Sequence, residues 1–144
     1  HTGAIDRLHF AAGGELLSAG GDGTVRAWDR GTGAELSRWQ TPDGARGPFE
    51  FSPDGRVVTA WCAADQRPAV WEARTGRLVR RLDRPPGELS GFKFSPDGAR
   101  LAAGGVYPDN AIGLWDVATG ARLAALEGHD NQVYDMAFSP DGAM

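Results

Sequence analysis

The stretch Asp22–Gly33 has the sequence DGTVRAWDRGTG, and close copies of it follow as DQRPAVWEARTG (Asp65–Gly76) and DNAIGLWDVATG (Asp109–Gly120). Each copy opens on an Asp, runs through apolar residues to a Trp and an acid, and closes on Thr-Gly. The three Trp residues are 43 and 44 positions apart. A phrase that returns at a fixed distance indicates a chain built from repeated structural units.

A second phrase keeps the same period. Phe-Ser-Pro-Asp-Gly begins at Phe51, Phe94 and Phe138, and a degenerate copy begins at Phe10. Ser-Pro-Asp-Gly suits a type I turn followed by a glycine of positive φ, which closes a β-hairpin. Apolar and polar residues alternate over Ile5–Phe10, as they do in a half-buried strand. A period of 40–45 residues made of short strands predicts one four-stranded propeller blade per unit.

Composition limits the class of protein. The chain has 144 residues, 41% of them hydrophobic, and no apolar run long enough for a membrane span. Its net charge of −4 argues against nucleic-acid binding, and its one cysteine, Cys62, excludes an internal disulfide and offers no metal cluster. We expect Cys62 to be a small core residue. Lys93 is the only lysine among 15 basic residues, which indicates a GC-rich, bacterial gene.

These phased motifs resemble the WD-repeat (WD40-type) family of β-propellers, which also shares the Gly128-His129 element and the Trp-Asp pairs at Trp28 and Trp115. The resemblance implies an all-β fold of about three four-stranded antiparallel blades and one extra strand, Gln132–Phe138. The expected units cover about 1–39, 40–82, 83–126 and a truncated 127–144.

Propeller rings hold about four to eight blades. We therefore expect an incomplete ring, a fragment of a larger propeller whose remaining blades come from the rest of the protein. Self-assembly is an alternative, but two copies would offer 26 strands, which divide poorly into four-stranded blades.

One set of polar residues allows two interpretations. Out of context, Ser18, His1 and Asp22 suggest a nucleophilic triad. The chain has no nucleophile elbow and no candidate oxyanion hole. The resemblance implies a different role, a structural hydrogen-bond chain in which the Trp28 indole, Ser18, His1 and Asp22 tie a loop to the sheet.

The same resemblance predicts that this network weakens along the chain. The second unit keeps Thr59, Asp65 and Trp71 but has no His, and the third keeps only Asp109 and Trp115, with Ala103 in place of the Ser. The last expected member is His129, which we predict to be without partners. The second acid of each Trp-acid pair is assigned to turn stabilisation: Asp29, Glu72 and Asp116.

The resemblance also implies a binding face, made by the loops that enter each first strand and by the turns between the second and third strands. Its candidate partner-binding residues are Asp6, Arg46, Glu88, Ser90, Tyr107, Gln132 and Tyr134. Tyr134, Tyr107 and Arg46 have the chemistry of interface anchors. The alternative is that each is merely exposed or packed.

Three functions follow. The first is a scaffold that binds a protein or peptide partner, without enzymatic activity, catalytic residues, metal or cofactor, within a larger multidomain bacterial regulator of the cytoplasm. The second is a propeller-based hydrolase or oxidoreductase whose site lies outside this chain. The third is a structural repeat without a specific partner.

Overall fold

A computed structural model describes residues 1–42, 45–106 and 110–142 of the chain. Its strands form three antiparallel sheets of four, and no α-helix occurs in these ranges. The expected all-β fold with three four-stranded antiparallel blades is therefore confirmed. Over the same ranges, no helix has the length and apolar character needed to cross a membrane.

Each sheet is built from strands that are consecutive in the sequence, so neighbours are joined by hairpins. The first sheet holds β1 (Ile5–Phe10), β2 (Leu16–Gly20), β3 (Thr24–Trp28) and β4 (Glu35–Gln40). The second holds β5 (Arg46–Phe51), β6 (Val57–Cys62), β7 (Arg67–Glu72) and β8 (Leu78–Arg81). The third holds β9 (Leu89–Phe94), β10 (Arg100–Gly105), β11 (Ile112–Asp116) and β12 (Arg122–Leu126).

The repeated turn phrases hold these hairpins through local side-chain bonds. In the turn between β5 and β6, the Ser52 hydroxyl donates to Asp54 Oδ1 at 2.6 Å, and Gly55 has a φ of 72°. Between β3 and β4, Asp29 Oδ1 accepts from the backbone N–H of Thr32 at 2.7 Å and from its hydroxyl at 2.8 Å. Asp116 makes the matching bonds to Thr119. The acid that follows each Trp thus fastens its own turn.

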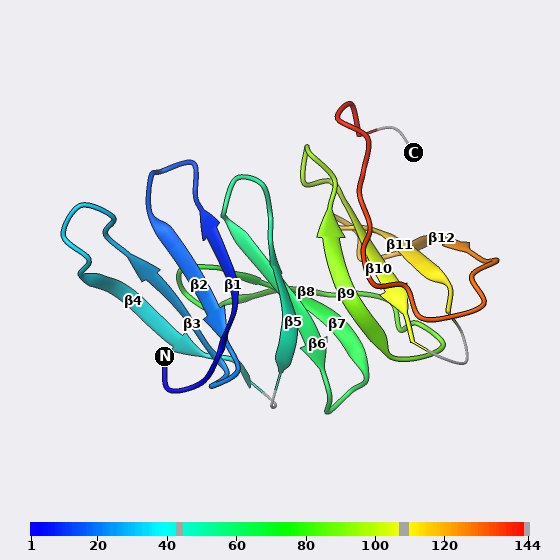
Figure 1. The fold of residues 1–144 in the computed structure, drawn as a ribbon, viewed down its shortest axis with the longest axis horizontal. Coiled ribbons are helices and arrows are strands. Elements are labelled where there is room, and N and C mark those ends of the chain that lie inside the picture. The colour runs from blue at the N-terminus through cyan, green and yellow to red at the C-terminus, as the bar shows by residue number, and fades with distance from the viewer. Residues whose placement is uncertain (43–44, 107–109, 143–144) are drawn as a thin grey trace.

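The three sheets stand side by side, with their first strands β1, β5 and β9 next to one another (Figure 1). One apolar core fills the space between the first and second sheets and includes Leu17, Val25, Val58 and Trp71. A second core lies between the second and third sheets. The second sheet therefore packs one face on the first sheet and the other on the third, as an inner blade of a propeller does.

The register of the strands places Trp28, Trp71 and Trp115 on the same side of their sheets, the side that faces the preceding blade. Trp71 and Trp115 are 1% and 0% exposed, because a preceding sheet covers them. Trp28 is half-buried on the outer face of the first sheet. Phe10, on the same face, is 65% exposed. The ring is thus open at its first blade.

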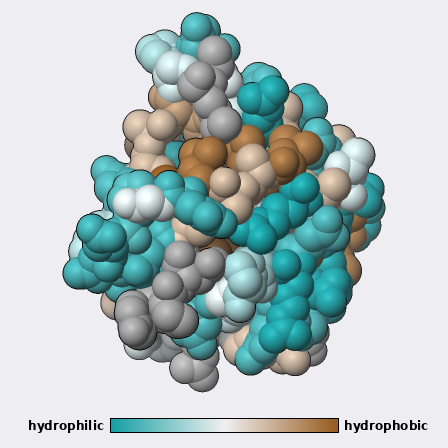
Figure 2. Space-filling view, turned by 90° about the vertical axis from the view of Figure 1, so that its right-hand side faces the viewer, coloured by the Kyte–Doolittle hydropathy of each residue, from teal (hydrophilic) through white to brown (hydrophobic). Residues whose placement is uncertain are grey.

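The ring is open at the third blade as well. Leu126 is exposed there and lies opposite Ile112 in the register of β11 and β12. Figure 2 views this end of the molecule and shows a hydrophobic area at its centre, surrounded by polar residues. The described residues form an open arc of three blades.

The extra strand expected at Gln132–Phe138 is not part of any sheet. Its chain runs beside β9 and β10 (Figure 1), and Val133 is buried there, with its carbonyl accepting from the Ser90 hydroxyl at 2.6 Å. A strand needs a hydrogen-bonded neighbour, and no second strand for this unit is available among the described residues. The segment is therefore placed against the third blade but is not paired.

Candidate functional site

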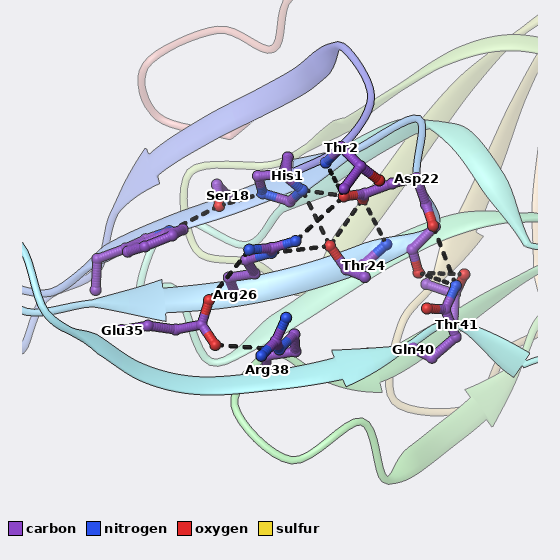
Figure 3. A network of polar contacts seen from close by, with 12 residues as sticks. His1, Thr2, Ser18, Asp22, Thr24, Arg26, Glu35, Arg38, Gln40 and Thr41 are labelled. Atoms are coloured by element: carbon purple, nitrogen blue, oxygen red, sulfur yellow. Dashed lines mark hydrogen bonds and ion pairs between the residues drawn. The ribbon is translucent and has the colours of Figure 1, made fainter.

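The polar residues of the first blade form one connected network (Figure 3). The Trp28 indole N–H donates to Ser18 Oγ at 2.8 Å, and Ser18 Oγ lies 2.7 Å from His1 Nε2. His1 Nδ1 lies 3.0 Å from Asp22 Oδ1. With the proton on Nδ1, the imidazole donates to Asp22 and accepts from Ser18, so each group has a partner. The structure thus brings together His1, Ser18, Asp22 and Trp28.

The network extends across the sheet beyond the residues expected from the sequence. The Thr24 hydroxyl donates to Asp22 Oδ1 at 2.7 Å, and Arg26 Nη2 lies 3.3 Å from Asp22 Oδ2. Arg26 Nη1 also donates to Glu35 at 3.2 Å. Thr24, Arg26 and Glu35 lie on β3 and β4, so the bonds tie three strands and the N-terminal loop into one unit.

This geometry serves structure rather than nucleophilic chemistry. Ser18, His1 and Asp22 follow the order of a catalytic triad, but Ser18 is 1% exposed, so a substrate has no access to its hydroxyl. Ser18 Oγ is also occupied by the Trp28 indole. Buried networks that are fully satisfied fix a unique arrangement of their elements.

The electrostatics of Asp22 follow from its bonds. Burial alone would raise the pKa of its carboxyl, but bonds from the Thr2 N–H, the Thr24 hydroxyl and the Thr24 N–H, together with the charge of Arg26, lower this pKa to about 2. The folded protein therefore holds Asp22 ionised more firmly than the unfolded chain does.

This difference predicts acid sensitivity of the first blade. Because the pKa of Asp22 is lower in the folded state, its contribution to the free energy of unfolding is present above about pH 4 and is lost as the pH falls towards 2. Asp22→Asn should destabilise the protein at pH 6 by about 1–2 kcal/mol, and this difference from the original protein should shrink at pH 2.5. Urea unfolding at both pH values measures it. An equal difference at both would contradict the prediction.

The second blade corrects one of our assignments. Thr59 was expected to accept from Trp71, but its hydroxyl donates to the carbonyl of Ala69 at 2.9 Å. The register pairs Val58 with Trp71 and Thr59 with Val70, so Thr59 points to the opposite face of the sheet and Ala60 occupies the position of Ser18. The Trp71 indole nitrogen consequently has no hydrogen-bond partner among the described residues.

Asp65 of the second blade contacts arginines, whereas the corresponding Asp22 of the first blade contacts a histidine. Asp65 forms an ion pair with Arg81 of β8, and its Oδ2 lies 3.7 Å from Arg67 Nε. The carboxylate that faces an imidazole in the first blade here compensates the charge of the fourth strand. Arg81 of β8 is thereby joined to the turn before β7.

The third blade and the fourth unit complete the series. The Trp115 indole donates to the backbone carbonyl of Asp83 at 2.9 Å, since Ala103 offers no hydroxyl. Asp109 lies outside the described residues. His129 is exposed and makes no side-chain hydrogen bond to any residue that the structure describes.

The candidate partner-binding residues do not form one cluster. Asp6 and Tyr134 line one groove, together with residues of β5 and β9. Ser90 is engaged internally, since its hydroxyl donates to the carbonyls of Gly104 and Val133. Glu88 borders a separate small pocket near Arg84, and Gln132 lines neither hollow. Tyr107 and the side chain of Arg46 lie outside the described residues.

The groove runs along the first strands of all three blades and encloses about 610 Å³. Its rim carries Tyr134, a residue that is 84% exposed, with Asp6 and Asp135. Gly21, in the turn between β2 and β3, and Gly47, at the start of β5, line it as well, so the expected binding face contributes to its wall.

The wall of the groove contains a charged group that sequence reasoning missed. Glu50 of β5 forms an ion pair with Arg7 of β1, and its Oε1 lies 3.9 Å from Lys93 Nζ of β9. One carboxylate thus joins all three blades. Its side chain is 9% exposed, and this burial raises the pKa of Glu50, although the charges of Arg7, Lys93 and His9 act in the opposite direction.

Comparison with known proteins is consistent with this arrangement. The family model described as "WD domain, G-beta repeat" matches the chain over residues 1–29, 76–116 and 120–144. These ranges cover most of the chain, including His1, Ser18, Asp22 and Trp28 and the segment that carries Tyr134. No curated protein matches the chain significantly.

There is no cluster of three or more His, Cys, Asp or Glu side chains suited to a metal ion within the described part of the chain.

Proposed function

Because the chain belongs to the WD40 family of propeller repeats, we propose that it is a non-enzymatic scaffold that binds a protein or peptide in the groove beside Tyr134. WD40 repeats generally mediate interactions between proteins. We further propose that this scaffold is part of a larger multidomain bacterial regulator of the cytoplasm. The arginine-rich, lysine-poor composition supports the bacterial origin.

The observation that carries this proposal is an exposed aromatic side chain on a groove with rigid walls. The groove is lined by three first strands, which are fixed by the cores between the sheets. Tyr134 is 84% exposed at the rim. Tyr is among the residues that most often dominate binding energy at protein interfaces, because it covers a large area and carries a polar end. Binding sites commonly combine such an anchor with a rigid scaffold.

The test is a selection of random displayed peptides on the 144-residue chain, with the site of each selected peptide mapped by NMR shifts. We expect shifts around Asp6, Tyr134 and Asp135, and we expect Tyr134→Ala to weaken binding about tenfold or more. Phe10→Ala is the matched control, since Phe10 is an exposed aromatic residue away from the groove.

Two results would refute the proposal. One is peptides that map only to the opposite edge, at turns such as Pro53–Gly55. The other is an unchanged affinity in the Tyr134→Ala protein.

A further inference from the structure

The groove holds five charged residues, and the structure separates them into two groups. Arg7 and Lys93 are both drawn to Glu50, which lies between them on the middle strand. Glu50 is nearly buried, whereas the two cations are each 38% exposed. A buried carboxylate holds its cations strongly, because an unpaired charge at that position would be costly. The basic residues of the groove are therefore already committed to an internal partner.

The two remaining acids have no such partner. Asp6 and Asp135 are exposed on the same groove, and neither forms an ion pair with a residue that the structure describes. Asp135 Oδ1 accepts from the backbone N–H of Met136 at 2.8 Å, a bond that leaves its negative charge in place. The free charge available to a ligand at the rim is thus negative.

Tyr134 adds a second preference of the same kind. Tyr134 is the most exposed of the large hydrophobic residues described, and it adjoins Asp135 in the sequence on the groove's rim. The face of an aromatic ring attracts cations, among them the guanidinium of arginine and the ammonium of lysine. Two exposed carboxylates and an exposed ring that line one groove complement a basic side chain in charge.

We propose that the groove binds an extended segment of its partner that presents a lysine or arginine side chain to Asp6, Tyr134 and Asp135. This inference rests on the proposed function and specifies the chemistry of the partner. Glu50 supports the preference indirectly, since it keeps Arg7 and Lys93 from repelling the basic side chain.

The selection described above also provides the first test, through the composition of the peptides that map to the groove. We expect enrichment in lysine and arginine. For one such peptide, titrated by calorimetry, Asp6→Asn and Asp135→Asn should each weaken binding about three- to tenfold, and the loss should diminish at high salt. Glu127→Gln is the matched control, because Glu127 is an exposed acid outside the groove.

Glu50→Gln supplies a readout that simple contact would not give. Glu50 is too buried to bind a basic side chain well, yet its neutralisation frees two cations in the groove. We expect Glu50→Gln to weaken binding of the basic peptide and to strengthen binding of a peptide in which each basic residue is replaced by glutamate. Circular dichroism checks that each variant is folded.

The outcomes separate the two proposals. Groove-binding peptides without lysine or arginine, or affinities unchanged by Asp6→Asn and Asp135→Asn, would overturn the basic partner and leave the scaffold function standing. If none of the selected peptides maps to the groove, both the scaffold function and the basic partner would be overturned.

Discussion

Trp71→Ala should lower the free energy of unfolding by about 3–5 kcal/mol, the range for truncating a large buried aromatic side chain. Trp71 is 1% exposed in the core between the first and second blades, and its ring centroid lies 6.3 Å from that of Trp39. The variant would leave a cavity between two sheets. Urea unfolding followed by circular dichroism measures the loss.

A pair of milder variants keeps this prediction testable if Trp71→Ala fails to fold. Trp71→Phe preserves most of the apolar volume, and it removes an indole N–H that has no partner among the described residues. Trp115→Phe also removes the bond to the Asp83 carbonyl. We therefore expect Trp115→Phe to cost about 1 kcal/mol more than Trp71→Phe. Equal costs would show that the Asp83 bond contributes nothing.

Gly113→Ala should destabilise the protein by about 1–3 kcal/mol or more, the range for overpacking a filled core. A Cβ on Gly113 would overlap the ring of Trp115, which is completely buried and cannot move aside. The matched control is Gly91→Ala, because a Cβ on Gly91 meets nothing within 4 Å. Gly91→Ala should stay within about 0.5 kcal/mol of the original protein.

The cause of the Gly113 effect can be isolated with a double-mutant cycle. In a Trp115→Phe background the smaller ring leaves room for the new methyl group, so Gly113→Ala should cost less than it does in the original protein. Thermal unfolding of the four proteins gives the coupling. Additive losses would show that Gly113 acts through its backbone rather than through contact with Trp115.

The hairpins and blades could be predicted from the sequence because their signals are local. Ser-Pro-Asp-Gly and the Trp-acid-Thr-Gly phrases act within a few residues, and the structure shows their bonds inside single turns, as at Asp54 and Asp29. The network of the first blade could also be predicted, because His1, Ser18, Asp22 and Trp28 all carry the chemistry that the resemblance requires.

The error at Thr59 shows where local signals stop. Ser18 and Trp28 are 10 residues apart, whereas Ala60 and Trp71 are 11 apart, because the turn between β6 and β7 is one residue longer. A shift of one residue moves a strand side chain to the opposite face. A hydroxyl beside the correct position was thus mistaken for the correct position.

The contacts of Glu50 with Arg7 and Lys93 depend on packing between blades, so the sequence of a single unit does not predict them. One signal was present: His9, Glu50 and Lys93 each precede the Phe that ends a first strand, and the last two have opposite charges. The involvement of Arg7 could not be read this way, since it stands two positions earlier on β1.

Stacked repeats are often described as a sum of unit stabilities and independent nearest-neighbour terms. Glu50 breaks that independence, because a single charge serves the junctions on both of its sides. When Arg7 is lost, the carboxylate can be attracted wholly to Lys93, so the second junction tightens as the first weakens. We therefore expect a change that weakens one junction to strengthen the other, with the middle blade coupling its two neighbours.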